Sequence, residues 1–224
     1  GNVLKEAVNK NIELNKSMTQ LQIREREAEY RALQAQINPH FLYNTLDSIN
    51  WMAIENGEYE ISRMIRNLGI ILRYSVNKSN SIVSIETVED WLEKYISLQQ
   101  MRFENIFDYK VSIEENAKPK KIHKLLLQPF IENAILHGLK EKEGQGMLCV
   151  DITLSGDKKM LNIIIEDNGI GMDEEFQKIM FQPFTRADDG RTTKVQGTGL
   201  GMAITKNIVN MMNGDIKVVS SLDN

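Results

Sequence analysis

Two glycine-rich segments are the parts of this sequence best suited to chemistry. The first, at residues 167–171, reads DNGIG and follows an alternating, strand-like run; the second, at residues 197–201, reads GTGLG and opens an apolar, helix-like run. Glycines let a backbone come close to a phosphate, and the N–H groups at a helix start favour negative charge. At the end of a strand, the carboxylate of Asp167 can accept a hydrogen bond from an exocyclic amine such as that of adenine. The two segments therefore predict a nucleotide pocket.

The common nucleotide-binding signatures are absent from the sequence. It contains neither G-x-x-x-x-G-K-[ST] nor a G-x-G-x-x-G between a strand and a helix. The predicted nucleotide pocket therefore belongs to an ATP-binding fold that uses neither of these two signatures.

A polar pair, Glu132 and Asn133, interrupts the apolar segment QPFIENAILHG at residues 128–138. In a helix, Ile131 and Ile135 would face the core and leave the polar pair at one edge. An amide oxygen is a hard ligand that suits a magnesium ion bridging phosphates. The alternative is a helix whose polar face is simply solvated, which the two glycine segments make less favourable.

The first forty residues show a heptad pattern, which is the first element that could help to position these residues. Its two core positions hold Leu4, Asn11, Met18, Glu25 and Ala32 and, alternating with them, Ala7, Leu14, Leu21, Ala28 and Ala35. This spacing is typical of a two-stranded coiled coil, in which an asparagine tends to fix a dimer. The other interpretation, a single helix packed on its own domain, fits the polar stretch at residues 20–31 less well.

Helical periodicity then runs to about Asn56, with a kink expected at Pro39 and a stop at Gly57. A second helix is predicted at residues 59–77, and two such hairpins from two chains would form a four-helix bundle. A third helix is predicted at residues 85–104, beginning after Ser84.

Near Asn105 the pattern changes to that of an α/β domain. We predict strands at residues 107–113, 148–154, 160–166 and 215–220, helices at 121–142 and 202–212, and a long polar loop or lid at 172–196.

The amino-acid composition limits the binding partners and the cellular compartment that we expect. The 224 residues are 42% hydrophobic and 26% charged, as in an ordinary globular protein. A net charge of −4 argues against a nucleic-acid partner. The single cysteine, Cys149, allows no internal disulfide and favours a reducing compartment. The sequence has no apolar run of membrane-spanning length. It also has no initiator methionine, and we expect either a fragment of a longer protein or the remnant of a tag at Gly1.

Several segments, taken together, resemble a known family. QPFIENAILHG, DNGIG and GTGLG resemble the nucleotide-binding boxes of the Bergerat-fold ATPases, which include histidine kinases, DNA gyrase, mismatch-repair ATPases and large heat-shock chaperones. Upstream, QAQINPHFLYNTLDSI and YISLQQMRFEN resemble segments of LytS/YesM-type sensor histidine kinases. The resemblance covers about residues 30–220, and the segments occur in family order.

The resemblance implies an α+β fold class: an N-terminal dimeric coiled coil and helical hairpin (a four-helix bundle in the dimer), followed by a Bergerat-fold α/β sandwich with a mixed sheet. The expected domains are a coiled-coil signalling helix at residues 1–36, dimerisation and phosphotransfer helices at 37–104, and an ATP-binding domain at 105–224. The closing strand of that domain is expected to be missing at the C-terminus.

The resemblance also implies residue roles. His40 would be the phosphorylated histidine, with Asn44 on the same helix face and Glu132 as a candidate base, because Phe41 rather than an acid follows His40. Asn133 would bind Mg²⁺. The nucleotide-binding residues implied are Asn133, His137, Asp167, Gly169, Gly171, Phe184, Arg186, Gly197, Thr198, Gly199, Leu200 and Gly201. Leu136 stands where the family usually has a lysine, which puts one phosphate contact in doubt.

The function implied is that of the cytoplasmic part of a bacterial inner-membrane sensor kinase. A homodimer would use ATP and Mg²⁺ to phosphorylate His40 and then pass the phosphoryl group to an aspartate of a response regulator. Contact with the membrane would come only through an N-terminal region outside this sequence. The alternatives are an ATP-driven dimer clamp without autophosphorylation, and a degenerate kinase that serves only as a scaffold. A histidine in a dimeric helical hairpin favours the kinase, because a clamp has no use for it.

Overall fold

The computed structural model describes residues 39–76, 81–185 and 199–222. It divides into two units, residues 1–48 and 49–224, which are described separately. The predicted heptad and the site residues Arg186, Gly197 and Thr198 lie outside the described residues.

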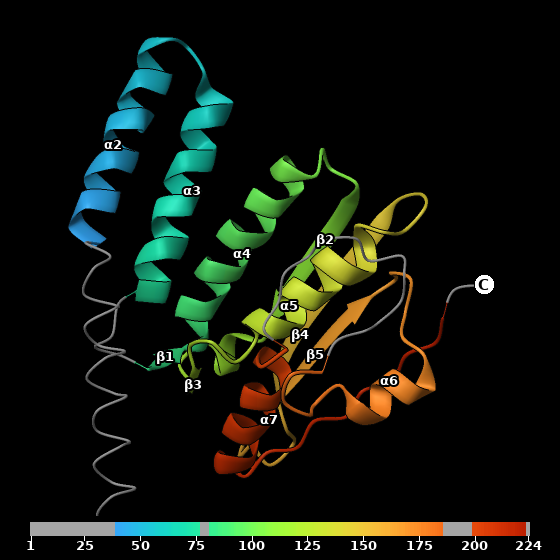
Figure 1. Cartoon of the computed structure of the whole chain (residues 1–224). Coiled ribbons are helices and arrows are strands. Elements are labelled where there is room, and N and C mark those ends of the chain that lie inside the picture. Colours follow the sequence, from blue (N-terminus) through green and yellow to red (C-terminus); the bar gives the residue numbers. More distant parts are fainter. Residues whose placement is uncertain (1–38, 77–80, 186–198, 223–224) are drawn as a thin grey trace, which may run out of the picture. The chain divides into compact units, whose positions relative to one another are not determined.

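Two helices form the predicted hairpin. Helix α2 (Pro39–Glu55) crosses from the first unit into the second, and α3 (Tyr59–Val76) returns after a tight turn (Figure 1). Gly57 ends the first helix in the left-handed region, with a φ of +75°. The Ser62 hydroxyl donates to Asn50 Oδ1 over 2.7 Å and ties the two helices together within the second unit. The predicted stop at Gly57 and the helix at 59–77 are confirmed, whereas the residues before the predicted kink at Pro39 lie outside the described part.

Helix α4 (Ile85–Arg102) begins where the sequence predicts. The Ser84 hydroxyl accepts from the Thr87 N–H over 3.3 Å and caps the helix. The helix ends two residues before the predicted boundary, because Glu104 and Asn105 adopt positive φ values. Trp91 of α4 stacks on Tyr74 of α3, with ring centroids 5.5 Å apart, and thereby joins the hairpin to the second part of the unit.

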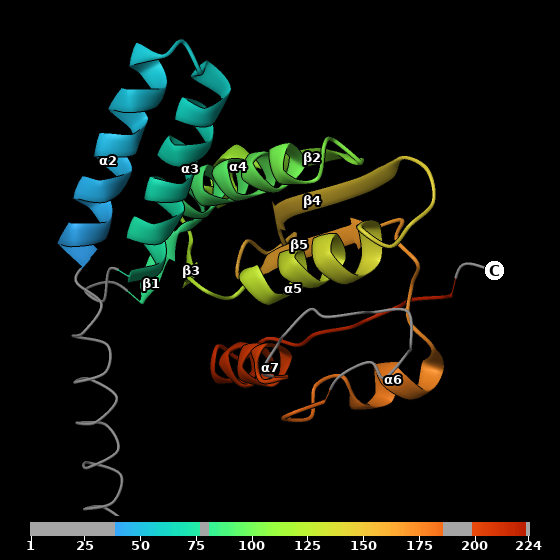
Figure 2. The same ribbon diagram turned by 45° about the horizontal axis from the view of Figure 1, so that its top comes forward.

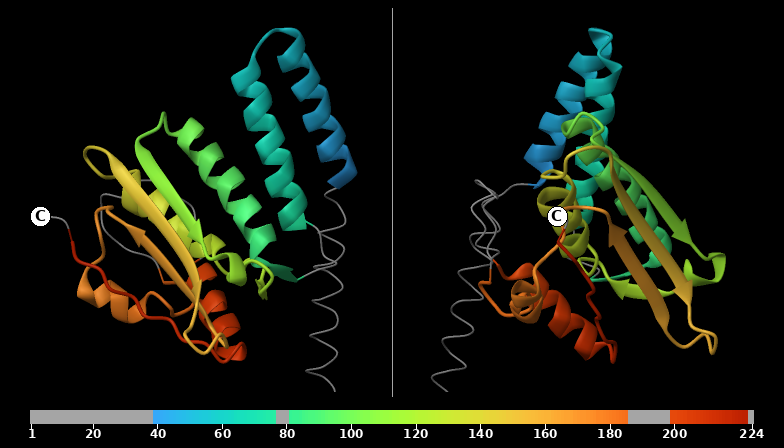
Figure 3. Two further views of the ribbon diagram at one scale, coloured as in Figure 1. Left: turned by 180° about the vertical axis from the view of Figure 1, so that it is seen from behind. Right: turned by 90° about the vertical axis from the view of Figure 1, so that its right-hand side faces the viewer.

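A mixed three-stranded sheet forms the α/β part. Strands β2 (Phe107–Ile113) and β4 (Gly146–Leu154) are parallel, and β4 and β5 (Leu161–Asp167) are antiparallel, in the order β2-β4-β5. Helices α4 and α5 lie on one face of this sheet (Figures 2 and 3), where Phe107 and Leu148 are fully buried. The α+β class and the mixed sheet are confirmed.

The predicted single helix at residues 121–142 is wrong. Residues Lys121–His123 form strand β3, which pairs antiparallel with β1 (Ile82–Ser84). Helix α5 (Gln128–Asn133) follows and continues as a π-helical turn, η2 (Ala134–Leu139). Pro129 explains the late start, because proline lacks an N–H and is tolerated only in a first helical turn.

The C-terminal part also differs from the prediction in two places. Residues Glu174–Ile179, expected to be irregular, form helix α6, because the Asp173 carboxylate accepts from the Phe176 N–H over 2.6 Å and caps it. The predicted helix after the second glycine segment is confirmed as α7 (Gly201–Met211). The predicted strand at 215–220 is absent from the described sheets. There Ser220 instead accepts hydrogen bonds from the Met172 N–H and the Gln177 side chain, so it is held by a loop and a helix.

None of the described helices combines the length and apolarity that a membrane span requires.

Substitution by alanine should change the free energy of unfolding in opposite directions at two glycines of the hairpin. Gly57 has a positive φ, and Gly69 lies inside α3; a Cβ at either position would meet no atom within 4 Å. We expect Gly57→Ala to lower the free energy of unfolding by about 1 kcal/mol, through left-handed strain. Gly69→Ala should raise it by about 0.5–1 kcal/mol, through helix propensity. Urea denaturation of both variants measures the difference, and a change of the same sign in both would contradict it.

Candidate nucleotide and phosphotransfer sites

The first glycine segment lies against the end of the π-helical turn. Asp167 is the last residue of β5, and its Oδ1 accepts from the Gly169 N–H over 2.9 Å. A Cβ on Gly138 would lie 2.8 Å from that same oxygen, and a Cβ on Gly169 would lie 2.5 Å from the Gly138 backbone. Side chains at Gly138 and Gly169 are therefore excluded, and the carboxylate is held where two bare backbones meet.

The carboxylate of Asp167 is perturbed by this setting. The residue keeps an exposed edge, but the surrounding protein partly desolvates the carboxyl group and raises its pKa. The Gly169 N–H acts in the opposite direction and lowers the pKa, as a smaller effect. A carboxylate with incomplete hydration is a strong acceptor for a ligand N–H.

The other members of the first segment have structural tasks. Asn168 Oδ1 accepts from the Met147 N–H over 2.7 Å and holds the segment beside the start of β4. Gly171 has a φ of +73°, and a Cβ there would overlap the carbonyl oxygen of Ser221. Gly171 is therefore required by the C-terminal segment that passes over it.

The polar pair lies in α5, just before the π-helical turn. Glu132 and Asn133 are half-buried, and Gln128 donates to Glu132 Oε1 over 2.7 Å. The charge of Glu132 also acts on Tyr95 of α4, whose pKa is raised to about 12 by burial first and by Glu132 second. Single π-helical turns are frequent at functional sites.

Two further residues of this helical segment were singled out from the sequence. His137 is half-buried and precedes the closely packed Gly138. Leu136, where the resemblance leads us to expect lysine, packs against the hydrophobic core.

The second glycine segment meets the opposite end of α5. Gly201 opens α7, and a Cβ on it would touch the Pro129 ring at 3.4 Å. The cap residue of α7, Leu200, provides no side-chain hydrogen bond to the first turn. Gly199 has a φ of +66°, and its carbonyl accepts from the Phe184 N–H over 2.9 Å. The first backbone N–H groups of α7 are therefore available to donate hydrogen bonds to an anion.

The lid residue Phe184 is 74% exposed and has a φ of +65°. Its neighbour Phe181 is held instead, because Lys206 of α7 lies over its ring at 4.8 Å from the centroid.

One helical segment therefore joins the two glycine segments. Asp167 and Gly169 lie at its Gly138 end, and Gly201 lies at its Pro129 end. These ends are nine residues apart in the sequence.

A second site lies on α2, in the first unit. The side chains of His40 and Asn44 are exposed and one helical turn apart, with Asn44 Nδ2 3.3 Å from His40 Nδ1. The contact engages the Nδ1 atom of the imidazole ring.

Sequence reasoning missed two residues at the nucleotide site. Gly138 was noted only as part of a motif, although its lack of a side chain makes room for Asp167. Gln128 was not considered, although its spacing of four residues from Glu132 on a helix indicates a side-chain pair.

Any divalent cation would have few ligands from the protein. Within the described residues no three His, Cys, Asp or Glu side chains cluster to hold a metal. The amide of Asn133 fits Mg²⁺, which usually takes one or two protein oxygens and keeps phosphate and water ligands.

Two family models match this chain. A family model described as histidine kinase matches residues 28–107. A second model, described as histidine kinase-, DNA gyrase B- and HSP90-like ATPase, matches residues 119–224.

Individual relatives give the same result. Sensor histidine kinase YesM of Bacillus subtilis is 41% identical over 161 residues, which cover 72% of this chain and 28% of YesM. Sensor protein kinase HptS of Staphylococcus aureus is 30% identical over 162 residues, covering 72% of this chain and 30% of HptS. The aligned part of this chain thus spans less than a third of the length of these relatives.

Among solved structures, a mycobacterial sensor histidine kinase, MprB, is similar with a TM-score of 0.43 at 19% identity, covering 59% of this chain and 81% of that one. A similarity of this size does not establish the fold by itself. The two family models, in contrast, follow one another along the chain and contain the His40 helix and both glycine segments. The chain therefore belongs to the sensor histidine kinases and carries the domains of an ATP-dependent histidine kinase.

Proposed function

We propose that this chain uses ATP to phosphorylate itself on His40 and passes the phosphoryl group to an aspartate of a response regulator. The observation that carries the proposal is the helical segment Gln128–Leu139, which has an acceptor carboxylate at one end and an open helix start at the other. An ATP molecule lying along this segment meets both.

At one end, Asp167 recognises adenine. Its carboxylate accepts a hydrogen from the exocyclic amine, and Gly138, Gly169 and His137 surround the base. Guanine carries a carbonyl oxygen at the equivalent position, which the carboxylate repels. Support comes from the close packing around Asp167, because the bare backbones of Gly138 and Gly169 hold the carboxylate in a fixed position.

At the other end, the start of α7 receives the phosphates. Gly199, Leu200 and Gly201 present backbone N–H groups, and Gly197, Thr198 and Arg186 join them from outside the described residues. Asn133 holds a magnesium ion, which neutralises phosphate charge when bound.

Transfer to His40 forms a bond between an imidazole nitrogen and the γ-phosphorus and breaks the bond to the bridging oxygen, so that ADP leaves. A neutral imidazole attacks through the nitrogen that carries no proton. If the Asn44 amide turns its oxygen to Nδ1, it accepts that N–H and leaves Nε2 as the nucleophile. Glu132 is our candidate to accept the imidazole proton. In the second step the N–P bond breaks and an aspartate oxygen takes the phosphoryl group.

We further propose that the chain works as a homodimer through the hairpin. Large apolar side chains on both helices are exposed in the single chain, among them Trp51 (65%), Met52 (62%), Ile61 (46%) and Leu68 (42%). Packing two hairpins into a four-helix bundle covers such faces.

We propose the domain boundaries that the sequence predicts: the signalling coiled coil at residues 1–36, dimerisation and phosphotransfer at 37–104, and nucleotide binding at 105–224. This part of the protein would act in the bacterial cytoplasm, where ATP is available.

The first test concerns His40. With γ-labelled ATP and Mg²⁺, the wild-type chain should acquire acid-labile label, and His40→Gln should acquire none. His123→Gln, which alters a histidine of β3, should remain labelled. A label that survives in His40→Gln would refute the assignment, and nucleotide binding without any label would point to the clamp.

The second test concerns Asp167. Loss of a charge-assisted hydrogen bond should weaken ATP binding by Asp167→Asn about 10–100-fold and reduce the preference for ATP over GTP. Glu166→Gln, which alters the exposed neighbour on the opposite face of β5, should bind as wild type. Calorimetry measures both, and unchanged affinity and selectivity in Asp167→Asn would exclude the role.

The pH dependence of binding follows from the same carboxylate. Because its pKa is raised, Asp167 takes up a proton at a higher pH than an ordinary aspartate. Wild-type affinity should therefore begin to fall earlier on acidification than the titration of the nucleotide alone explains. Asp167→Asn should lack this additional fall.

The third test concerns the dimer. Light scattering should give twice the chain mass of 25.7 kDa. Leu68→Glu should shift the chain toward the monomer, because it buries a charge in the bundle. Ile164→Glu changes a similarly exposed residue of β5 and should leave the dimer intact. A wild-type monomer at tens of micromolar would count against the bundle.

A further inference from the structure

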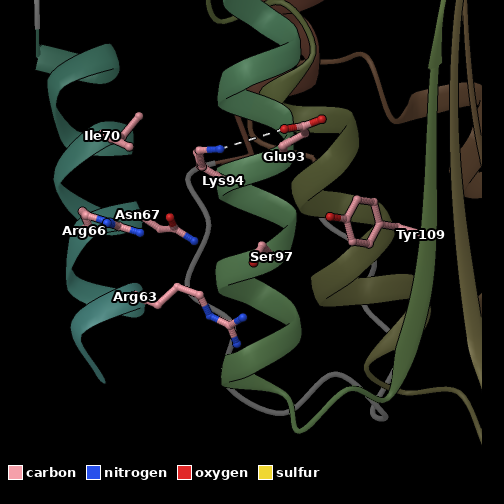
Figure 4. Close-up of a pocket in the computed structure, with 8 residues that line it drawn as sticks. All are labelled: Arg63, Arg66, Asn67, Ile70, Glu93, Lys94, Ser97 and Tyr109. Carbon is pink, nitrogen blue, oxygen red and sulfur yellow. Dashed lines mark ion pairs between the residues drawn. The ribbon is translucent and has the colours of Figure 1, made fainter. Parts of the chain in front are cut away.

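A pocket of about 400 Å³ lies between α3 and α4, apart from both sites described above. Its polar lining comes from Arg63, Arg66 and Asn67 of α3, Glu93, Lys94 and Ser97 of α4, and Tyr109 of β2. In Figure 4, Arg63 and Asn67 extend from α3 toward α4, and Lys94 extends from α4 toward α3. None of these residues belongs to the proposed nucleotide or phosphotransfer machinery.

Asn67 is the unusual member of the lining. It is only 6% exposed as a residue, and its side chain points into the pocket. The amide can donate to an anion through its N–H groups.

The charges around Asn67 favour an anion. Arg63 is paired with Glu60 at 3.2 Å, and Lys94 lies 3.5 Å from Asp90 and 3.9 Å from Glu93. Such surface pairs contribute little and exchange readily for another anion. Arg66 makes no ion pair with the described residues, so its charge is uncompensated there.

The neutral groups fit the same ligand. The hydroxyl groups of Ser97 and Tyr109 can donate, as can the Asn67 amide, and Glu93 is the one acid in the lining. Ile70 and the Tyr109 ring provide apolar surface for a carbon skeleton. The volume lies within the ordinary range for small-molecule sites.

We propose that this pocket binds a small organic anion, whose carboxylate or phosphate group is held by Arg66, Asn67 and Lys94. Because its donors come from both α3 and α4, the bound anion would bridge the hairpin and the first helix of the following domain. The proposal does not depend on phosphorylation of His40.

Calorimetric titration of the whole chain with two probes tests the site. Citrate represents the carboxylates; inorganic phosphate, added with the nucleotide site saturated by an ATP analogue, represents the phosphates. Both titrations use metal-free chloride buffer of constant ionic strength. We expect saturable binding of one equivalent of at least one probe, and the probe that binds more tightly identifies the class.

Variants distinguish binding in this pocket from nonspecific attraction of the anion by positive charge on α3. Arg66→Gln should weaken binding about tenfold, as expected for one charge-assisted contact. Arg73→Gln removes the same charge from α3 outside the pocket and should leave the affinity unchanged. Asn67→Ala should also weaken binding, because it removes the amide N–H groups that can donate to the anion. If neither probe binds saturably, or if Arg66→Gln and Arg73→Gln bind as wild type, the proposal is wrong.

Discussion

The helical segment Gln128–Leu139 packs closely against the first glycine segment, and the arrangement of the candidate nucleotide site depends on this constraint. At its C-terminal end, a Cβ on Gly169 would lie 2.5 Å from the Gly138 backbone, and a Cβ on Gly138 would lie 2.8 Å from Asp167 Oδ1. At its N-terminal end, a Cβ on Gly201 would make an ordinary contact with the Pro129 ring at 3.4 Å. Both glycine motifs of the sequence thus lie beside the same helical segment.

The core side of that segment explains why it can hold polar groups on its other side. Ile131, Ile135 and Leu139 are spaced four residues apart and are 0–1% exposed. Residues with this spacing share one face of a helix. The π-helical turn at Ala134–Leu139 takes more residues per turn, and the three side chains stay on the core through it. Glu132, Asn133 and His137 remain only half-buried and open to a ligand.

Sequence reasoning succeeded where a local signal matched the tertiary structure. Alternation at 107–113 and 148–154 predicted β2 and β4, and Ser84 predicted the start of α4. It failed at β3 because three residues are too few to show a period, and Pro129 was not used as a boundary. The π-helical turn leaves no local signal, since it arises from packing. The stretch at 215–220 alternates like a strand, but it is held by Met172 and Gln177 in place of a neighbouring strand.

The hairpin is connected to the nucleotide site through packed groups. The Tyr74 hydroxyl donates to the Lys124 carbonyl over 2.6 Å, and the Lys124 ammonium donates to the carbonyls of Tyr74 and Ser75 at the end of α3. Burial raises the pKa of Tyr74 and lowers that of Lys124, so both groups are partly withdrawn from water. Beyond Tyr74, Trp91 stacks on Tyr95 at 5.1 Å between ring centroids.

Both routes from the end of α3 lead toward the same helix. Lys124 stands four residues before Gln128, where α5 begins, and the charge of Glu132 in α5 acts on Tyr95 through space. A change in the position of α3 would disturb the Tyr74–Lys124 hydrogen bonds and the Tyr74–Trp91 stack, because buried hydrogen bonds and stacked rings tolerate little displacement. The end of α3 is therefore tied by direct contacts to the segment that leads into α5, which carries the polar pair of the candidate nucleotide site.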